Sequence, residues 1–273
     1  MAGAAHRDLP LQLVTTGSGR TQHVVELHIE ELLGAGIEQV ALVTMPGATS
    51  LVTQLLARFG SSIVLIEQAE PLGFGHAILC AEGWVGRQPF VTQVCDHIFV
   101  TYPNPSCTRQ LLDIAVREEC SVSGVQATNE SELPYFGVVG GRRVKGSDDL
   151  YEVSKVLEKP TPTVAEEHCV VPGVRRGKYL AFFGVHALTP AIFDQLREYQ
   201  STLPAGATLG VTESLALLAA REKYLALEVR GHRVDLEGRF GLLRAQLALA
   251  MHGPHRDEIL RLILEEVAEA QRV

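Results

Sequence analysis

The sequence predicts an α/β fold: a Rossmann-like, mostly parallel sheet with helices on both faces and a small antiparallel excursion. Runs such as 39–44 and 62–67 are almost wholly apolar, which is typical of strands buried on both faces. Segments with helical periodicity, about 10–14 residues long, separate these runs, as in units of strand, helix and strand. After residue 134 the pattern changes to two neighbouring strand-like runs, which indicate a hairpin.

The first half of the chain alternates strands with helices. Residues 1–22 are irregular, and a helix then begins near Gln22, with apolar residues recurring on one face until the glycines at 34 and 36 end it. The predicted order after this helix is strand 39–44, helix 48–59, strand 62–67, helix 75–81, strand 90–95, helix 108–119 and strand 121–127.

The second half begins with the hairpin and ends in helices. The predicted order is hairpin 135–158, strand 178–188, helix 190–199, amphipathic helix 211–223, strand 224–231, and helices 238–251 and 255–271. The linker-like pieces, 141–149 and 200–210, are short. We therefore expect one α/β domain over residues 1–253, followed by a C-terminal helix within 254–273.

Composition excludes several classes of protein. The net charge of −8 and the pI near 5.7 do not suggest a nucleic-acid-binding surface. Five cysteines without CxxC spacing indicate free thiols in a reducing compartment and not a zinc site. No apolar run approaches the ~20 residues that span a bilayer, and no signal peptide is evident. We expect a cytoplasmic protein without a membrane partner.

Two carboxylates are candidate metal ligands. Asp96 follows an apolar strand, and ligands of open parallel sheets lie beyond the carboxyl ends of the strands. Asp235 follows a strand and a turn, before a Gly-bounded helix. Mg²⁺ needs only one or two protein carboxylates, and substrate phosphates and water complete its shell. The alternative is that Asp96 caps a turn and Asp235 caps a helix. The pattern alone leaves both interpretations open.

Two other motifs are candidates for binding. Gly73, Gly75 and His76 stand where a loop becomes a helix, so a ligand would be able to approach the backbone there. The alternative is a plain loop with His76 packed on the sheet. Glu158 and Lys159 end a strand before a proline, and would bind sugar hydroxyls and a phosphate. A solvated charge pair is the alternative.

Taken in order, these motifs resemble those of the sugar-1-phosphate nucleotidylyltransferases, and most of all the UTP–glucose-1-phosphate uridylyltransferase type. The resemblance spans roughly residues 2–250. The matching segments are AGIEQVALVT (35–44), PLGFGHAILCA (71–81), VCDHIFV (94–100), YFGVV (135–139), VLEKP (156–160), YLAFFGVHALTP (179–190), TESLALLAAREK (212–223) and GHRVDLEG (231–238).

The resemblance implies roles for single residues. Asp96 and Asp235 would hold a catalytic Mg²⁺. Gly3, Gly73, Gly75 and His76 would bind the nucleotide, the last two against a uracil or thymine ring. Gly137, Glu158, Lys159 and Gly184 would bind the sugar phosphate, and Arg7 and Lys159 would act in catalysis. The implied partners are a nucleoside triphosphate, UTP or dTTP, and a sugar 1-phosphate, and homo-oligomerisation is a further expectation.

The N-terminus departs from the family pattern. AGAAHRDLP (2–10) has the outline of the phosphate loop, with Arg7 in place of its arginine. The apolar strand that precedes this loop in the family is absent, and Leu11 or Gln12 stands where the family has the lysine of a Pro-Lys pair. Arg20 is the nearby cation. Because the absent strand would be central, we expect an unpaired edge in the sheet and weak activity.

Two functions remain open at this stage. The retained carboxylates and binding motifs favour an active nucleotidyltransferase. The absent lysine and strand favour a non-catalytic sugar-nucleotide-binding or regulatory protein on the same fold. An α/β hydrolase is excluded, because no G-x-S-x-G nucleophile motif occurs.

Overall fold

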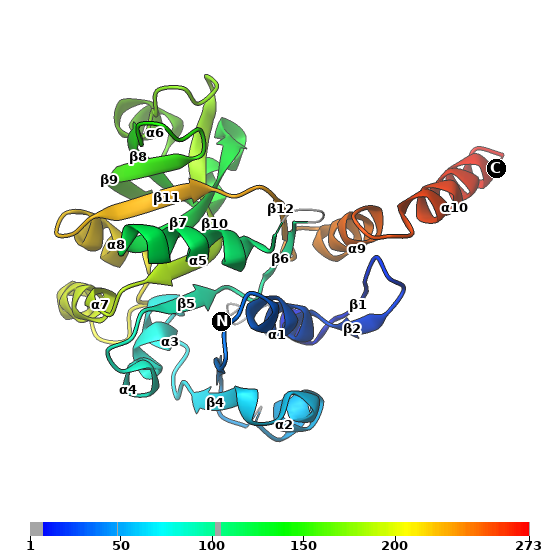
Figure 1. Ribbon diagram of the computed structural model, residues 1–273, viewed down its shortest axis with the longest axis horizontal. Coiled ribbons are helices and arrows are strands. Elements are labelled where there is room, and N and C mark those ends of the chain that lie inside the picture. The colour runs from blue at the N-terminus through cyan, green and yellow to red at the C-terminus, as the bar shows by residue number, and fades with distance from the viewer. Residues whose placement is uncertain (1–7, 48, 102–104, 273) are drawn as a thin grey trace.

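The structure is a computed structural model that describes residues 8–47, 49–101 and 105–272 (Figure 1). Gly3 and Arg7 lie outside the described residues, so their predicted roles stay predictions.

The described part of the chain has twelve strands, ten α-helices and three 3₁₀ helices. The strands are β1 Leu13–Thr15, β2 Thr21–His23, β3 Val40–Thr44, β4 Ile63–Glu67, β5 Phe90–Gln93, β6 His97–Val100, β7 Ser121–Asn129, β8 Gly137–Arg143, β9 Leu150–Glu158, β10 Lys178–Leu188, β11 Tyr224–Glu228 and β12 His232–Asp235. The α-helices are α1 Val24–Gly34, α2 Thr49–Leu56, α3 Phe74–Cys80, α4 Glu82–Val85, α5 Cys107–Glu118, α6 Pro162–His168, α7 Ala191–Thr202, α8 Thr212–Ala219, α9 Gly241–Met251 and α10 Arg256–Ala270. Three short 3₁₀ helices are η1 Leu9–Leu11, η2 Ala57–Ser62 and η3 Glu130–Tyr135.

The main sheet has six strands in the order β5-β10-β7-β11-β9-β8. In this sheet only β7 and β11 pair in parallel, and the other pairs are antiparallel. The prediction of a mostly parallel sheet is therefore wrong, and the fold is α/β with mixed sheets. An apolar run such as β10 shows that a strand is buried on both faces, but it does not fix the direction of its neighbours.

Helices cover both faces of this sheet, as predicted. Alternate residues of β11 enter different cores: Tyr224 and Ala226 pack with α7 and α8, whereas Leu225 and Leu227 pack with α5. This two-residue period is that of a strand between two layers of helices (Figure 1). The central strands of the main sheet are thus covered by helices on both faces.

A second, separate sheet holds β3 and β4 in parallel, with α1 and α2 packed on it. Among the described residues β3 pairs only with β4, and β5 pairs only with β10. Within the described ranges, the edge of β3 away from β4 and the edge of β5 away from β10 therefore have no hydrogen-bonded partner strand. The expectation of an unpaired edge is confirmed within this part of the chain.

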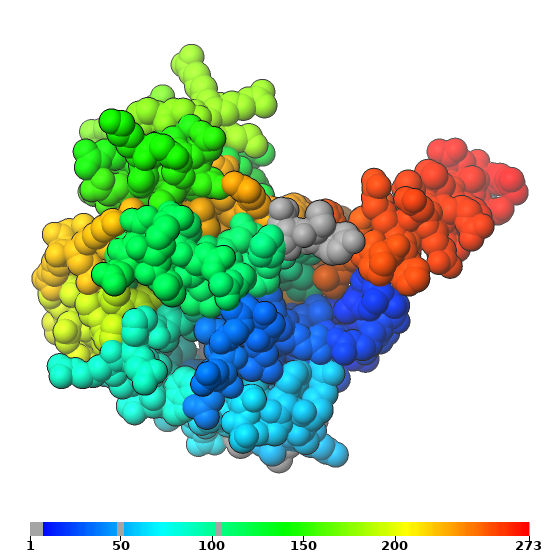
Figure 2. All heavy atoms as spheres, in the orientation of Figure 1, coloured from blue at the N-terminus to red at the C-terminus, as the bar shows by residue number. Residues whose placement is uncertain are grey.

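The C-terminal helices form an arm that projects from the body (Figures 1 and 2). α9 packs against β1 and β12, and two hydrogen bonds join Thr15 to Gln246. Helix α10 is present where the sequence predicts it, and none of its residues is buried. The division at residue 253 and homo-oligomerisation stay predictions. No helix in the described ranges is long and apolar enough to cross a membrane.

A buried histidine lies in the middle of the main sheet. His186 Nδ1 is 2.5 Å from Ser123 Oγ, which is also 2.5 Å from the Tyr224 hydroxyl. Burial lowers the pKa of His186 from 6.5 to about 4. The folded protein therefore holds this imidazole neutral at pH values where the unfolded chain binds a proton.

We predict a loss of stability on mild acidification that depends on His186. The contribution of His186 to the free energy of unfolding is fully present above pH 6.5 and decreases as the pH falls towards 4. In this range the imidazole takes up a proton only in the unfolded state. Between pH 7.5 and pH 5 the free energy of unfolding should fall by about 2 kcal/mol from this group. Urea unfolding at both pH values measures it.

His186→Gln should reduce this pH-dependent fall, whatever its effect on stability at pH 7.5. The control is His168→Gln, because the His168 side chain is exposed, and this variant should keep the wild-type fall. An unchanged fall in His186→Gln would contradict the prediction.

Candidate functional site

Pairing of β6 with β12 brings the two predicted metal ligands together. In this antiparallel ladder Asp235 lies opposite His97, and the Leu236 N–H donates to the Asp96 carbonyl at 2.9 Å. Asp96 directly precedes β6, and Asp235 is the last residue of β12. Two carboxylates far apart in the sequence thus lie at the same end of one ladder.

The surroundings of Asp96 favour its charged form. Its side chain is only 21% exposed, and its Oδ1 lies 2.5 Å from His97 Nδ1. Burial by itself raises the pKa of Asp96, but the hydrogen bond and the charge of His97 outweigh this effect, so the pKa lies below its usual value. Asp96 is therefore a carboxylate at neutral pH, as a metal ligand must be.

Neither carboxylate caps a helix. Asp96 is followed at once by β6, and α9 begins only at Gly241, with Phe240 at its N-cap. Asp235 does have a local role, because its Oδ1 accepts the Glu237 N–H at 2.8 Å and so fixes a turn. This single bond uses one lone pair of the Asp235 carboxylate and leaves its other lone pairs unassigned.

The donor set fits a Mg²⁺ ion. Two carboxylates are the usual protein contribution to a Mg²⁺ site whose other ligands are phosphate oxygens and water. No group of three His, Cys, Asp or Glu side chains within the described ranges is arranged to hold a metal. An ion at Asp96 and Asp235 would therefore need oxygens from a substrate, which is consistent with a site for phosphates.

Arg233 links the end of β12 to two of the segments that are predicted to bind the sugar, and the sequence analysis missed it. Its guanidinium lies 3.6 Å from the centre of the Phe136 ring and donates to the Phe182 carbonyl. Burial lowers the pKa of Arg233 to about 10, while the charges of Asp235 and Asp96 oppose this shift. Arg233 is thus a cation at neutral pH, held by Phe136 and the Phe182 carbonyl, and it interacts electrostatically with Glu132, Asp235 and Asp96.

Gly137, Glu158 and Thr212 form one cluster, which includes two of the residues predicted to bind the sugar. Gly137 lies opposite Glu158 in the β8–β9 ladder, and the Thr212 hydroxyl donates to Glu158 Oε2 at 2.7 Å. A Cβ at Gly137 would lie 2.8 Å from the Phe182 ring and 3.0 Å from Thr212 Oγ1. Glycine is therefore needed here for packing, whether or not a sugar also approaches.

Lys159 and Gly184 have backbones with positive φ. Lys159 has φ +43°, and its exposed ammonium lies 3.7 Å from Glu158 Oε1. Gly184 has φ +95° at an irregularity of β10, where its carbonyl accepts the Val94 N–H at 3.0 Å. Gly184 therefore lies next to the segment that carries Asp96, while Lys159 presents an exposed cation, paired with Glu158, directly after β9.

The predicted nucleotide loop packs tightly on residues 208–210. A Cβ at Gly73, which has φ +95°, would lie 2.5 Å from Thr208, and one at Gly75 would lie 2.5 Å from the Gly210 carbonyl oxygen. Both glycines are thus required for contact between two loops. Since Gly210 is two residues from Thr212, this contact joins the nucleotide loop to the sugar-binding cluster.

Gln68 is a second residue that the sequence analysis missed. It is fully buried after β4, and its Nε2 contacts the Gly73 carbonyl at 3.1 Å and His76 Nδ1 at 2.9 Å. Its Oε1 is buried and has no hydrogen-bond partner. The amide thus holds both Gly73 and His76 in place beneath the surface of the loop. Its position directly after an apolar strand was the available signal.

Neither Leu11 nor Arg20 provides the positive charge that would bind a phosphate at the N-terminal loop. Leu11 is the last residue of η1 and carries no charge. Arg20 lies in the β1–β2 hairpin and pairs with Glu30 at 2.5 Å. The charge near the carboxylates comes instead from Arg233.

Comparison with known proteins decides the family. Residues 7–235 match the sequence model of the nucleotidyl transferase family. The chain belongs to this family. The resemblance seen in the sequence motifs is thereby confirmed for most of this nucleotidyltransferase, which is an enzyme by its family.

Two relatives are named for an activity, and they are matched over different shares of their length. The nucleotidyltransferase is 27% identical to a UTP–glucose-1-phosphate uridylyltransferase of Streptococcus pyogenes, over 90% of this chain and 84% of the relative. It is 28% identical to the uridylyltransferase YngB of Bacillus subtilis strain 168, over 77% and 65%.

Solved structures share the fold. A UDP-glucose pyrophosphorylase complexed with UDP-glucose is 26% identical, with a TM-score of 0.68, over 83% of this chain and 86% of the other. A UTP-bound enzyme from Acinetobacter baumannii, at 21% identity, has a TM-score of 0.73 over 96% and 93%, which is a likeness of fold.

Asp96→Asn is expected to lower Mg²⁺-dependent turnover of the nucleotidyltransferase at least about a hundredfold, because charge stabilisation at the phosphates is lost. The fold should persist, since an amide is able to keep the contact with His97. Pyrophosphate release measures turnover, and near-ultraviolet circular dichroism checks the fold. Asp113→Asn, at an exposed carboxylate on α5, is the matched control. Full activity of Asp96→Asn would exclude Asp96 as a metal ligand.

Gly75→Ala is expected to destabilise the protein even without nucleotide. The new methyl group would overlap the Gly210 carbonyl oxygen and Leu196, and overpacking of this kind costs about 1–3 kcal/mol. Thermal unfolding without ligand measures the loss. Gly83→Ala, in α4 with no atom within 4 Å of the new Cβ, should be neutral. Equal stability of the two variants would mean that Gly75 is not a packing residue.

Proposed function

We propose that this nucleotidyltransferase transfers UMP from UTP to glucose 1-phosphate in a Mg²⁺-dependent reaction and releases pyrophosphate. The observation that carries the proposal is the pair Asp96 and Asp235, held at one end of the β6–β12 ladder beside the cluster of Gly137, Glu158 and Thr212. The relatives that are named UTP–glucose-1-phosphate uridylyltransferases support the choice of both substrates.

The transfer requires a phosphate oxygen of the sugar 1-phosphate to attack the α-phosphorus of the nucleotide. A new P–O bond forms as the bond to the pyrophosphate oxygen breaks, and pyrophosphate carries away the charge. This chemistry asks the protein mainly to position the two substrates and to offset negative charge. When bound, Mg²⁺ supplies a Lewis acid for the phosphate oxygens.

The chain's own residues divide this work between them. Asp96 and Asp235 hold the Mg²⁺, and Arg233 adds a fixed positive charge next to them. Glu158, oriented by Thr212, accepts hydrogen bonds from sugar hydroxyls, and Lys159 binds the sugar phosphate. Gln68 positions His76, the residue that the resemblance places against the base.

Leu11 supports a second candidate function. An aliphatic residue in η1, where the family pattern has a phosphate-binding lysine, favours a protein that binds the sugar nucleotide without turning it over. Pyrophosphate release from UTP and glucose 1-phosphate with Mg²⁺ separates the two functions. Binding of UDP-glucose without pyrophosphate release would exclude catalysis and leave the binding function.

We expect pyrimidine nucleotides to stabilise the protein more than purine nucleotides. With ligand in excess, the stabilisation follows RT ln(1 + [L]/Kd), so a tenfold difference in affinity corresponds to about 1.4 kcal/mol. Thermal-shift titrations with UTP, dTTP, ATP and GTP test this. The advantage of UTP should disappear in Gln68→Leu. A larger shift with ATP or GTP would contradict the assignment of the base.

Lys159→Gln should raise the KM for glucose 1-phosphate about tenfold or more and leave the KM for UTP nearly unchanged, because one charge-assisted bond to the sugar phosphate is lost. Steady-state kinetics with each substrate varied in turn measure both constants. Lys155→Gln, on an exposed position of the same strand, is the control. A rise confined to the KM for UTP would show that Lys159 contacts the nucleotide and not the sugar phosphate.

A further inference from the structure

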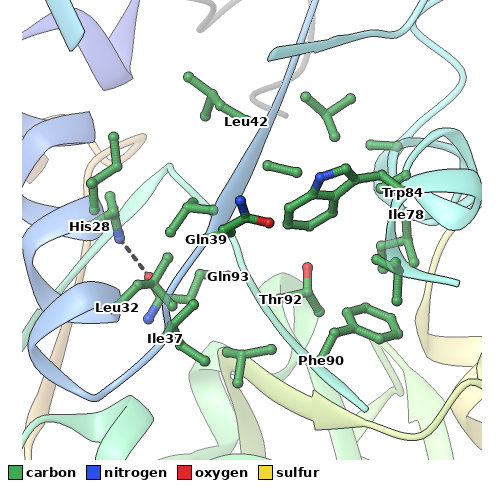
Figure 3. A pocket seen from close by; sticks show the side chains of 18 of the residues that line it. His28, Leu32, Ile37, Gln39, Leu42, Ile78, Trp84, Phe90, Thr92 and Gln93 are labelled. Atoms are coloured by element: carbon green, nitrogen blue, oxygen red, sulfur yellow. Dashed lines mark hydrogen bonds between the residues drawn. The ribbon is translucent and has the colours of Figure 1, made fainter. Parts of the chain in front are cut away.

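A network of polar side chains connects α1 and α5 with the strand that leads to Asp96. His28 and Glu31 lie one turn apart on α1, and both contact the side-chain amide of Gln93 at the end of β5. Gln93 Oε1 lies 3.1 Å from His28 Nδ1, as Figure 3 shows, and Gln93 Nε2 donates to Glu31. One turn of α1 therefore holds the Gln93 amide at both of its polar atoms.

Glu31 anchors this network to the N-terminal end of α5. Its carboxylate accepts the Thr108 N–H at 2.9 Å, the Thr108 hydroxyl at 3.0 Å and the Cys107 thiol at 3.0 Å. Burial and the charge of Glu31 raise the pKa of Cys107 well above its usual value, so the thiol keeps its proton and stays a donor. Because a carboxylate only accepts hydrogen bonds, the atom of Gln93 that faces Glu31 is the donor Nε2.

This orientation of the Gln93 amide determines how His28 takes part. Its Oε1 faces the ring and accepts, so the neutral imidazole donates from Nδ1. Burial lowers the pKa of His28 below its usual value, although the bond to Gln93 and the charge of Glu31 oppose this effect. His28 is therefore uncharged at neutral pH, and its single N–H is committed to Gln93.

His28 also packs on the strand that follows Asp96. Its ring lies edge-on to the Phe99 ring of β6, with the two ring centres 5.6 Å apart. Asp96 stands in the turn between Gln93, the last residue of β5, and His97, the first residue of β6. One buried side chain thus contacts a residue on each side of the turn that carries the predicted metal ligand.

Backbone bonds hold this turn from the opposite direction. The Val94 N–H donates to the Gly184 carbonyl at 3.0 Å, and the Asp96 carbonyl accepts the Leu236 N–H at 2.9 Å. These bonds come from β10 and from the end of β12, so the contacts of His28 add a restraint from α1. Such a restraint matters for catalysis, because a misplacement of ~1 Å can cost about a hundredfold in rate.

We propose that His28 is a positioning residue, which holds the turn carrying Asp96 in the geometry that binds the metal and the substrate phosphates. It acts through its contacts with Gln93 and Phe99 and not on a substrate. The inference rests on the proposed function and adds to it a residue of α1. A histidine that only fills space in the core would contribute to stability and leave the geometry of the turn unchanged.

Steady-state kinetics of two variants test this role. His28→Leu is similar in size but lacks the N–H, and its kcat for pyrophosphate release should fall at least about tenfold, as is usual when a residue that orients a metal ligand is lost. The KM values for UTP and glucose 1-phosphate should change less than about threefold. His28→Asn, whose amide N–H is able to replace Nδ1–H, should recover most of the kcat. A wild-type kcat in His28→Leu, or no recovery in His28→Asn, would overturn the proposal.

A double-mutant cycle tests whether His28 acts through Gln93. Gln93→Leu should lower kcat by a factor similar to that of His28→Leu. The double variant should be within about threefold of the slower single variant, because residues that act as a unit give non-additive losses. The control is Ile29→Val, at the next buried residue of α1, which packs with Val40 and Val52; it should lower thermal stability but keep the wild-type kcat. Losses that multiply in the double variant, or an equal loss in Ile29→Val, would overturn the proposal.

Hydrogen exchange measured by mass spectrometry tests the position of the turn without turnover. In His28→Leu the amides of residues 94–97 should exchange at least about tenfold faster than in the wild-type protein, whereas in Ile29→Val they should exchange at the wild-type rate. If the wild-type protein releases no pyrophosphate, the proposed function fails, and the contrast in exchange still decides whether His28 holds the turn. Equal exchange in the three proteins would overturn the inference.

Discussion

The antiparallel ladder between β6 and β12 is the interaction on which the candidate site depends. It joins two strands of four residues each, and it places Asp235 opposite His97 and Leu236 next to Asp96. Without this ladder Asp96 and Asp235 would belong to unconnected loops. The ladder also positions Arg233, whose contacts with Phe136 and with the Phe182 carbonyl reach two of the segments that are predicted to bind the sugar. The two predicted metal ligands and these segments are therefore connected through one short piece of backbone.

The sequence allowed most elements of the main sheet to be located, but not their directions. The long helices and the apolar strands, such as β10, were predicted because periodicity and burial follow from local composition. Strand direction depends on which chain segments meet, and the antiparallel partners of β10 are distant in the sequence. β12 was missed for a related reason: His232 and Arg233 do not look like a buried strand, and only pairing with β6 makes them one.

The candidate site was predictable where chemistry requires a particular residue type. Asp96 and Asp235 stood out because a carboxylate after a strand is a plausible ligand, and the structure places them together. Arg233 and Gln68 were missed because their roles depend on burial and on contacts that no short pattern encodes. The glycines at 73 and 75 were noticed for the right reason, a close approach to the backbone, but the approaching group in the structure is the loop 208–210.

The contact between the N-terminal hairpin and the C-terminal arm has a consequence for biosynthesis. Thr15 and Gln246, 231 residues apart, exchange two hydrogen bonds, and Gly17 packs closely against Gly253. At ~5–20 residues per second, a ribosome needs roughly 10–50 s to synthesise the partner of β1 after β1 itself. During that time the hairpin is exposed to chaperones and proteases without its docking surface. The β1–β2 hairpin therefore reaches its final packing only after α9 has left the ribosomal exit tunnel.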